Sequence, residues 1–128
     1  MSYYFSKTLD CGPEEAAQRA TEALKAQGFG VLTEIDVSQT LKNKIGVDFR
    51  PYRILGACNP KLAHEALSAE SKIGLMLPCN VIVQDAGDGK TEVAAIDPVA
   101  SMMAIDNARL NEAAKLVQGL LRKVIDAI

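Results

Sequence analysis

The apolar residues of this chain recur with a helical period in some segments and with a two-residue period in others. The clearest helical segment is C-terminal, where apolar positions lie three and four residues apart. They are Leu110, Ala113, Ala114, Val117, Leu120, Leu121, Val124 and Ile128. The pattern predicts a long amphipathic helix that covers a sheet. Gly119 interrupts this segment at a cost near 1 kcal/mol relative to Ala, so we expect a close helix contact there.

A second helix is predicted near the N-terminus. Pro13 suits the first helical position, and the two acidic residues that follow it suit the positive end of the helix dipole. One face of this helix carries small side chains, mainly alanines, which lets a helix sit close on a sheet. Gly28 is placed to end it.

Five β-strands are predicted, over residues 3–9, 29–35, 52–58, 79–85 and 91–97. Two short helical inserts are expected, one from Val37 to about Lys44 and one directly after Asn59-Pro60. The resulting order, β-α-β-β-β-β-α, predicts an α+β fold with an antiparallel sheet and helices on one face. A chain of 128 residues with 48% apolar residues favours a single domain, 1–128.

The last two strands are predicted to form a hairpin around Gly87-Asp88-Gly89. A three-residue loop pairs Val83 with Val93 and Cys79 with Asp97. A two-residue turn is the alternative, but it places two acidic side chains opposite each other, which destabilises a sheet by some tenths of a kcal/mol. We therefore expect the three-residue loop.

This register brings chemically useful side chains to one end of the sheet. Cys79 and Asp97 share the face of Val83, and Cys58, which has the parity of Ile54, joins them if that face meets the helices. The arrangement requires the third and fourth strands to be antiparallel neighbours, since parallel strands would separate the two cysteines by about 20 Å. The candidate ligand-binding residues are Cys58, Asn59, Cys79, Asn80 and Asp97.

Two interpretations of Cys58 remain open. Its position before the helix at Asn59-Pro60 would lower the pKa of its thiol and make it reactive. Alternatively it is a small, inert core residue, and burial would raise its pKa. We favour the inert interpretation and assign no catalytic residue.

No metal or other cofactor is predicted. Cys58, His64, Cys79 and Asp97 would have to converge, but they show none of the paired spacings that mark zinc sites. His64 lies between the apolar positions of its predicted helix and should point towards water. Asp97 already has a structural explanation as the N-cap of the turn that begins at Pro98.

Charge and composition exclude several classes of partner. The net charge is −2, and the 14 basic residues are scattered, so nucleic acid is not an expected partner. No uncharged stretch is long enough to cross a bilayer, and the N-terminus lacks the features of a secretory signal. Three cysteines in such a chain are best interpreted as reduced thiols. We therefore expect a cytoplasmic protein without a membrane partner.

Several segments resemble the domain-of-unknown-function 302 family. They are Gly28-Phe29-Gly30-Val31-Leu32-Thr33-Glu34-Ile35-Asp36, Thr40-Leu41-Lys42, Tyr52-Arg53-Ile54-Leu55-Gly56-Ala57-Cys58-Asn59-Pro60, Leu77-Pro78-Cys79-Asn80-Val81 and Asp97-Pro98. The resemblance implies a small α+β fold similar to the TATA-binding-protein-like class, and it implies no established activity. The Cys-Asn positions typical of the family fall on Cys58, Asn59, Cys79 and Asn80.

Three functional hypotheses follow. The first is a non-enzymatic domain that binds a small molecule or partner near the Cys-Asn motifs, as a homodimer on the general frequency of such assemblies. The second is a thiol-dependent or metal-assisted enzyme that uses Cys58. The third is a structural role, in which the Cys-Asn pairs fix strand ends and the outer surface carries the interaction.

Overall fold

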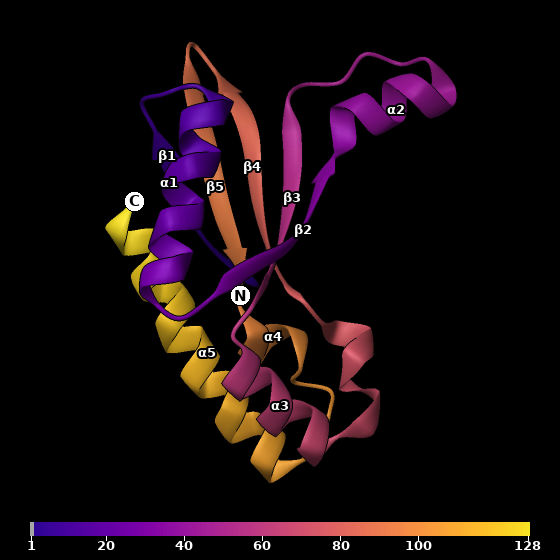
Figure 1. The fold of residues 1–128 in the computed structure, drawn as a ribbon, viewed down its shortest axis with the longest axis vertical. Coiled ribbons are helices and arrows are strands. Elements are labelled where there is room, and N and C mark those ends of the chain that lie inside the picture. The colour runs from indigo at the N-terminus through magenta and orange to yellow at the C-terminus, as the bar shows by residue number, and fades with distance from the viewer. Residues whose placement is uncertain (1) are drawn as a thin grey trace.

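A computed structural model describes residues 2–128, which form one five-stranded antiparallel sheet in the order β1-β5-β4-β3-β2 (Figure 1). The strands are β1 (Tyr4–Leu9), β2 (Gly30–Asp36), β3 (Tyr52–Cys58), β4 (Cys79–Gly87) and β5 (Lys90–Ile96). The helices are α1 (Pro13–Ala26), α2 (Val37–Ile45), α3 (Pro60–Ala69), η1 (Ser71–Met76), α4 (Pro98–Ser101) and α5 (Ala108–Ala127). The predicted α+β class and antiparallel sheet are confirmed.

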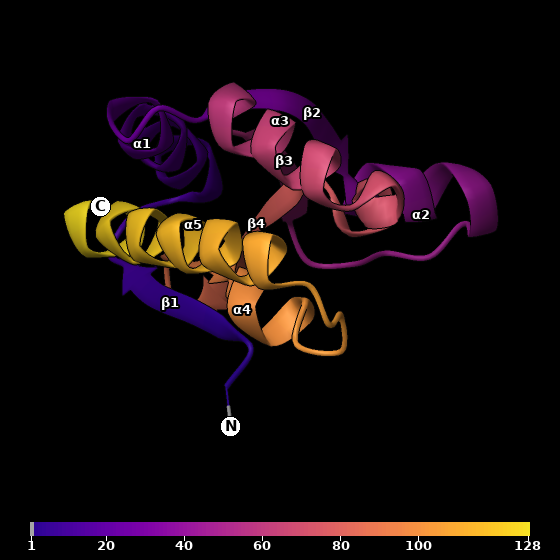
Figure 2. The same ribbon diagram turned by 90° about the horizontal axis from the view of Figure 1, so that it is seen from below.

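Helices α1 and α5 cover the same face of the sheet. Helix α1 contacts β2, β4 and β5, and α5 contacts β1 and β5. Figure 2 shows α1, α3 and α5 gathered on one side, with α2 set apart from them. None of the described helices is long and apolar enough to span a bilayer.

The small-residue face of α1 explains its close packing on the sheet. Ala16, Ala20 and Leu24 are completely buried, so the helix backbone lies near the sheet. Together with the apolar side chains of the strands and of the C-terminal half of α5, they form the main hydrophobic core.

The first half of α5 extends past the end of the sheet and contacts α3 and α4 (Figure 1). A second, smaller core forms there, from Ala66, Ile73, Met102, Leu110 and Ala114. Helix α5 thus holds both cores together. The sequence pattern did not predict the 3-10 helix η1, and it predicted only a turn at Pro98, where the single-turn helix α4 begins, because each is too short for a helical period to show.

The hairpin has the predicted strand register but a different turn. Val83 pairs with Val93, as expected, but the pairing of β4 with β5 ends at Val81 and Ala95, so the predicted pair of Cys79 with Asp97 is not formed. The connection, however, is a two-residue turn at Asp88-Gly89, with φ angles of +54° and +74°. A bulge between Asp85 and Gly87 absorbs the extra residue. A two-residue turn with positive φ angles matches the twist of the strands. Because of the bulge, the two acidic side chains do not lie opposite each other, so the repulsion that led us to predict a three-residue loop is absent.

Three further predictions require correction. Gly119 is exposed, and a Cβ added there would meet nothing within 4 Å, so no close helix contact explains it. The first strand begins at Tyr4 rather than at residue 3, and the second begins at Gly30, because Phe29 is the buried residue that closes the end of α1 against the core. His64 is exposed on α3, as predicted.

Candidate functional site

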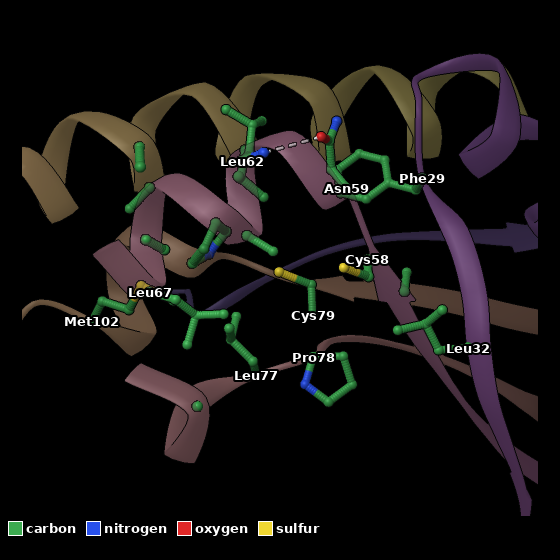
Figure 3. Close-up of a pocket in the computed structure, with 18 of the residues that line it drawn as sticks. Phe29, Leu32, Cys58, Asn59, Leu62, Leu67, Leu77, Pro78, Cys79 and Met102 are labelled. Carbon is green, nitrogen blue, oxygen red and sulfur yellow. Dashed lines mark hydrogen bonds between the residues drawn. The ribbon is translucent and has the colours of Figure 1, made fainter. Parts of the chain in front are cut away.

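A pocket of about 400 Å³ lies where the sheet ends and α3, α4 and α5 continue beyond it (Figure 3). Its walls come from the end of β3, the start of β4, β2 and the three helices. The lining residues are Phe29, Leu32, Thr33, Ala57, Cys58, Asn59, Leu62, Ala63, Ala66, Leu67, Gly74, Leu77, Pro78, Cys79, Pro98, Met102, Leu110, Ala113, Ala114 and Val117. None of these side chains carries a formal charge at neutral pH, so the pocket is an apolar one.

The start of α3 positions one wall. The Oδ1 atom of Asn59 accepts a hydrogen bond from the backbone N–H of Leu62 at 3.3 Å, and Pro60 occupies the first turn. This N-cap fixes where the helix begins. As a result Leu62, Ala63 and the other small or branched residues of this helix face are turned towards the pocket.

The two sequence motifs meet at the sheet end of the pocket. Strands β3 and β4 are antiparallel neighbours, with Ala57 paired to Cys79, which confirms the arrangement that the candidate site required. Cys58 is the last residue of β3 and Cys79 the first of β4. Figure 3 shows both sulfur atoms directed into the pocket. Residues 21 positions apart in the chain therefore become neighbours there.

The predicted parity of β3 was nevertheless wrong. Leu55 and Ala57 are the buried residues that face the helices, whereas Tyr52 and Ile54 lie on the uncovered face. Strict alternation would turn Cys58 away from the helices. It lines the pocket because it ends the strand, where the chain leaves the sheet to enter α3.

Burial controls the chemistry of the second thiol. Desolvation raises the pKa of Cys79 to about 11, and the neighbouring Cys58 adds to the effect. Cys79 is therefore a neutral thiol at physiological pH. Such a group is a weak hydrogen-bond donor and a small apolar body rather than a nucleophile.

The other two predicted site residues lie outside the pocket. Asn80 is exposed, because its position on β4 alternates with that of Cys79. Asp97 accepts hydrogen bonds from the backbone N–H groups of Val99 and Ala100 and from the side-chain amide of Gln118. Its oxygens thus cap α4 and tie it to α5, so the N-cap explanation of Asp97 is confirmed.

Most of the pocket wall was not predicted as a site. Leu62 and Leu67 both line the pocket from α3, and Leu67 remains 45% exposed there. Met102 is buried and lines the pocket, while Met103 is exposed. The sequence signal that could have indicated this wall was the apolar face of the short helix after Asn59-Pro60, formed by Leu62, Ala63, Ala66 and Leu67. Among residues 2–128, no cluster of three or more His, Cys, Asp or Glu could hold a metal ion.

Fold and site together define a small α+β domain with an apolar pocket at the end of an antiparallel sheet. The family model described as "Domain of unknown function DUF302" matches residues 5–128, and the chain belongs to that family. The crystal structure of an uncharacterized conserved DUF302 protein from Bacillus stearothermophilus is similar, with a TM-score of 0.90 and 30% identity over 99% of this chain and 98% of that one. Comparison with curated proteins gave no match.

Proposed function

We propose that this protein binds a small, uncharged and mainly apolar molecule in the pocket and catalyses no reaction on it. The observation that carries the proposal is a space of about 400 Å³ bordered by side chains without charge. Ligand pockets typically measure about 300–1,000 Å³ and are lined mainly by apolar groups. Burying a charged ligand group here would leave that charge unpaired, at a cost of several kcal/mol.

The polar groups of the pocket support recognition rather than reaction. The Asn59 carbonyl oxygen already accepts the N-cap hydrogen bond. The Cys79 thiol has a pKa of about 11, so only about one molecule in 10⁴ carries the thiolate at pH 7. The thiols of Cys58 and Cys79 are then weak polar contacts at one end of an apolar ligand.

Possible partners for a thiol mechanism lie elsewhere. The single histidine, His64, is exposed on α3, and Asp97 is engaged by backbone amides and by Gln118. A cysteine nucleophile normally relies on an adjacent base or a lowered pKa. Binding without catalysis therefore explains how these residues are arranged, and it requires neither an adjacent base nor a lowered thiol pKa. The three free thiols suit a reducing compartment, and on this basis we propose a cytoplasmic location.

The proposal is tested with the uncharged fluorescent probe N-phenyl-1-naphthylamine, whose aromatic rings suit an apolar pocket. In Ala63→Phe an aromatic ring is added at the pocket wall, whereas in His64→Phe the same ring is added at the next residue, on the exposed side of α3. We expect Ala63→Phe to weaken probe binding at least about tenfold and His64→Phe to leave it unchanged. Equal binding by all three proteins, with folding intact, would contradict a ligand site in this pocket.

Three further measurements separate the proposal from its alternatives. Native mass spectrometry of freshly purified protein should reveal any retained non-covalent ligand as added mass that disappears on denaturation. The rate of Cys58 alkylation as a function of pH tests the enzyme hypothesis, since a thiol pKa clearly below that of free cysteine would support catalysis. Cys58→Ala and Cys79→Ala variants that bind the probe normally but unfold more easily would favour the structural role.

A further inference from the structure

The sheet face opposite α1 and α5 is hollowed. A depression of about 390 Å³ lies over β3, β4 and β5, and its floor and rim combine apolar, aromatic and polar side chains. Its lining residues are Tyr3, Tyr4, Arg50, Tyr52, Asn80, Ile82, Gln84, Glu92, Ala94, Ala95 and Ile96. None of the described helices packs into it. We call this surface the open-face hollow.

A second unusual feature lies beside this hollow. Helix α2 and the segment that returns from it to β3, residues 37–51, project from the body of the protein (Figure 1). We call them the α2 arm. Helix α2 has no buried residue, and three apolar side chains of the arm face solvent: Ile45 (66% exposed), Val47 (42%) and Phe49 (40%). The α2 arm buries too little apolar surface within the single chain to offset the conformational entropy that it loses when it is ordered.

The total surface area shows how much burial is missing. A compact monomer of 13.7 kDa is expected to expose about 6,600 Å². This chain exposes 7511 Å², an excess of about 900 Å² over that expectation. Each partner in a standard protein interface buries about 800 Å². The excess therefore matches the area that one subunit contributes to a stable dimer.

We propose that two copies of this chain form a two-fold symmetric dimer in which the α2 arm of each copy covers the open-face hollow of the other. Arg50 and Tyr52 belong to the hollow and lie at the end of the arm, so the two surfaces are continuous. A two-fold contact requires each copy to present both halves of the interface, and this continuity provides them.

Charge complementarity supports the same occupant. Within the described part of the chain, Glu92 of the hollow forms no salt bridge, and its carboxylate accepts only the side-chain amide hydrogen bond of Gln84. The arm carries Lys44, which is exposed and likewise forms no salt bridge there. Bringing Lys44 of one copy to Glu92 of the other pairs both charges as water leaves the interface.

Sedimentation equilibrium of the purified chain tests the dimer. We expect the wild-type protein to sediment with twice its 13.7 kDa chain mass at micromolar concentration. Ile45→Glu places a charge on the arm at a side chain that the single chain leaves exposed, so the variant should fold normally and show a dimer dissociation constant raised at least about tenfold. Leu116→Glu is the matched control, because Leu116 is 60% exposed on the outer side of α5; it should leave the dimer intact.

Charge reversal tests which surfaces meet. Lys44→Glu and Glu92→Lys should each weaken association severalfold, and the double variant should restore it, because the pair is re-formed with opposite polarity. Circular dichroism checks that each variant is folded. A wild-type monomer at 100 µM would overturn the proposal. So would a dimer that Ile45→Glu leaves intact, as expected if edge strands pair instead, or a double variant that remains as weak as the single ones.

Discussion

Gly56 of β3 lies between Thr33 and Pro78, two residues of the pocket wall, and replacing it by Ala is the most direct test of the packing there. A Cβ at this position would collide with Oγ1 of Thr33 on β2 and would approach Cγ of Pro78 to 2.8 Å. Both neighbours are hard to move, because Thr33 is β-branched and the Pro78 ring is part of the backbone. Overpacking typically costs about 1–3 kcal/mol, and with two stiff neighbours we expect about 3 kcal/mol, or a fall in Tm of roughly 10 °C.

Urea and thermal unfolding measure this loss, and Gly119→Ala is the control. It makes the same chemical change at an exposed helical glycine whose added Cβ meets nothing within 4 Å, so it should raise the free energy of unfolding by up to about 1 kcal/mol. The double variant Thr33→Ala/Gly56→Ala should recover part of the lost stability, since it removes the closest contact. A Gly56→Ala protein within about 0.5 kcal/mol of wild type would refute the packing argument.

Three further predictions concern the Cys-Asn motifs and Asp97. The pKa of Cys79 is higher in the folded protein, about 11 against an ordinary 9, so the stability it contributes is present below pH 9 and is lost as the pH rises through 11. Wild type should lose about 2 kcal/mol more than Cys79→Ala between pH 9 and pH 11, and parallel pH profiles would contradict the burial of this thiol. Asp97→Ala should cost about 1–2 kcal/mol, and Asp97→Asn less, in urea titrations, because the cap of α4 is lost. Asn59→Ala should cost about 1 kcal/mol while Asn80→Ala costs under about 0.5, since only Asn59 caps a helix; equal losses would mean that the two motifs have the same role.

The sequence predicted those parts of the fold that depend on local pattern. The periodicity of α5, Pro13 at the start of α1 and the alternation of Val81, Val83 and Val93 each specify an element through short-range physics, and the structure contains all of them. The pairing of β3 with β4, which brings the two Cys-Asn motifs together, was a condition of the predicted site rather than a deduction from a local pattern, and the structure meets it.

The remainder depends on long-range packing. Whether the end of β3 turns Cys58 towards or away from the helices depends on where the chain leaves the sheet, and a strand pattern alone does not contain that information. The pocket itself exists because α5 extends past the sheet and α3 packs against it there, leaving Leu67 half exposed at the wall. Asp97 was correctly explained as a cap, which is a local signal, but its hydrogen bond to Gln118 joins elements distant in sequence.

Methyl-resolved NMR of the labelled protein, titrated with n-octanol, tests the apolar pocket most directly, because it locates an apolar molecule without relying on a variant. The account predicts saturable shifts for methyl groups of the pocket wall, such as those of Leu62, Leu67 and Met102. Methyl groups of the main core, such as those of Leu9 and Val93, should not move. Shifts confined to the open-face hollow, or no saturable shifts at all, would contradict a ligand site beneath α3 and α5.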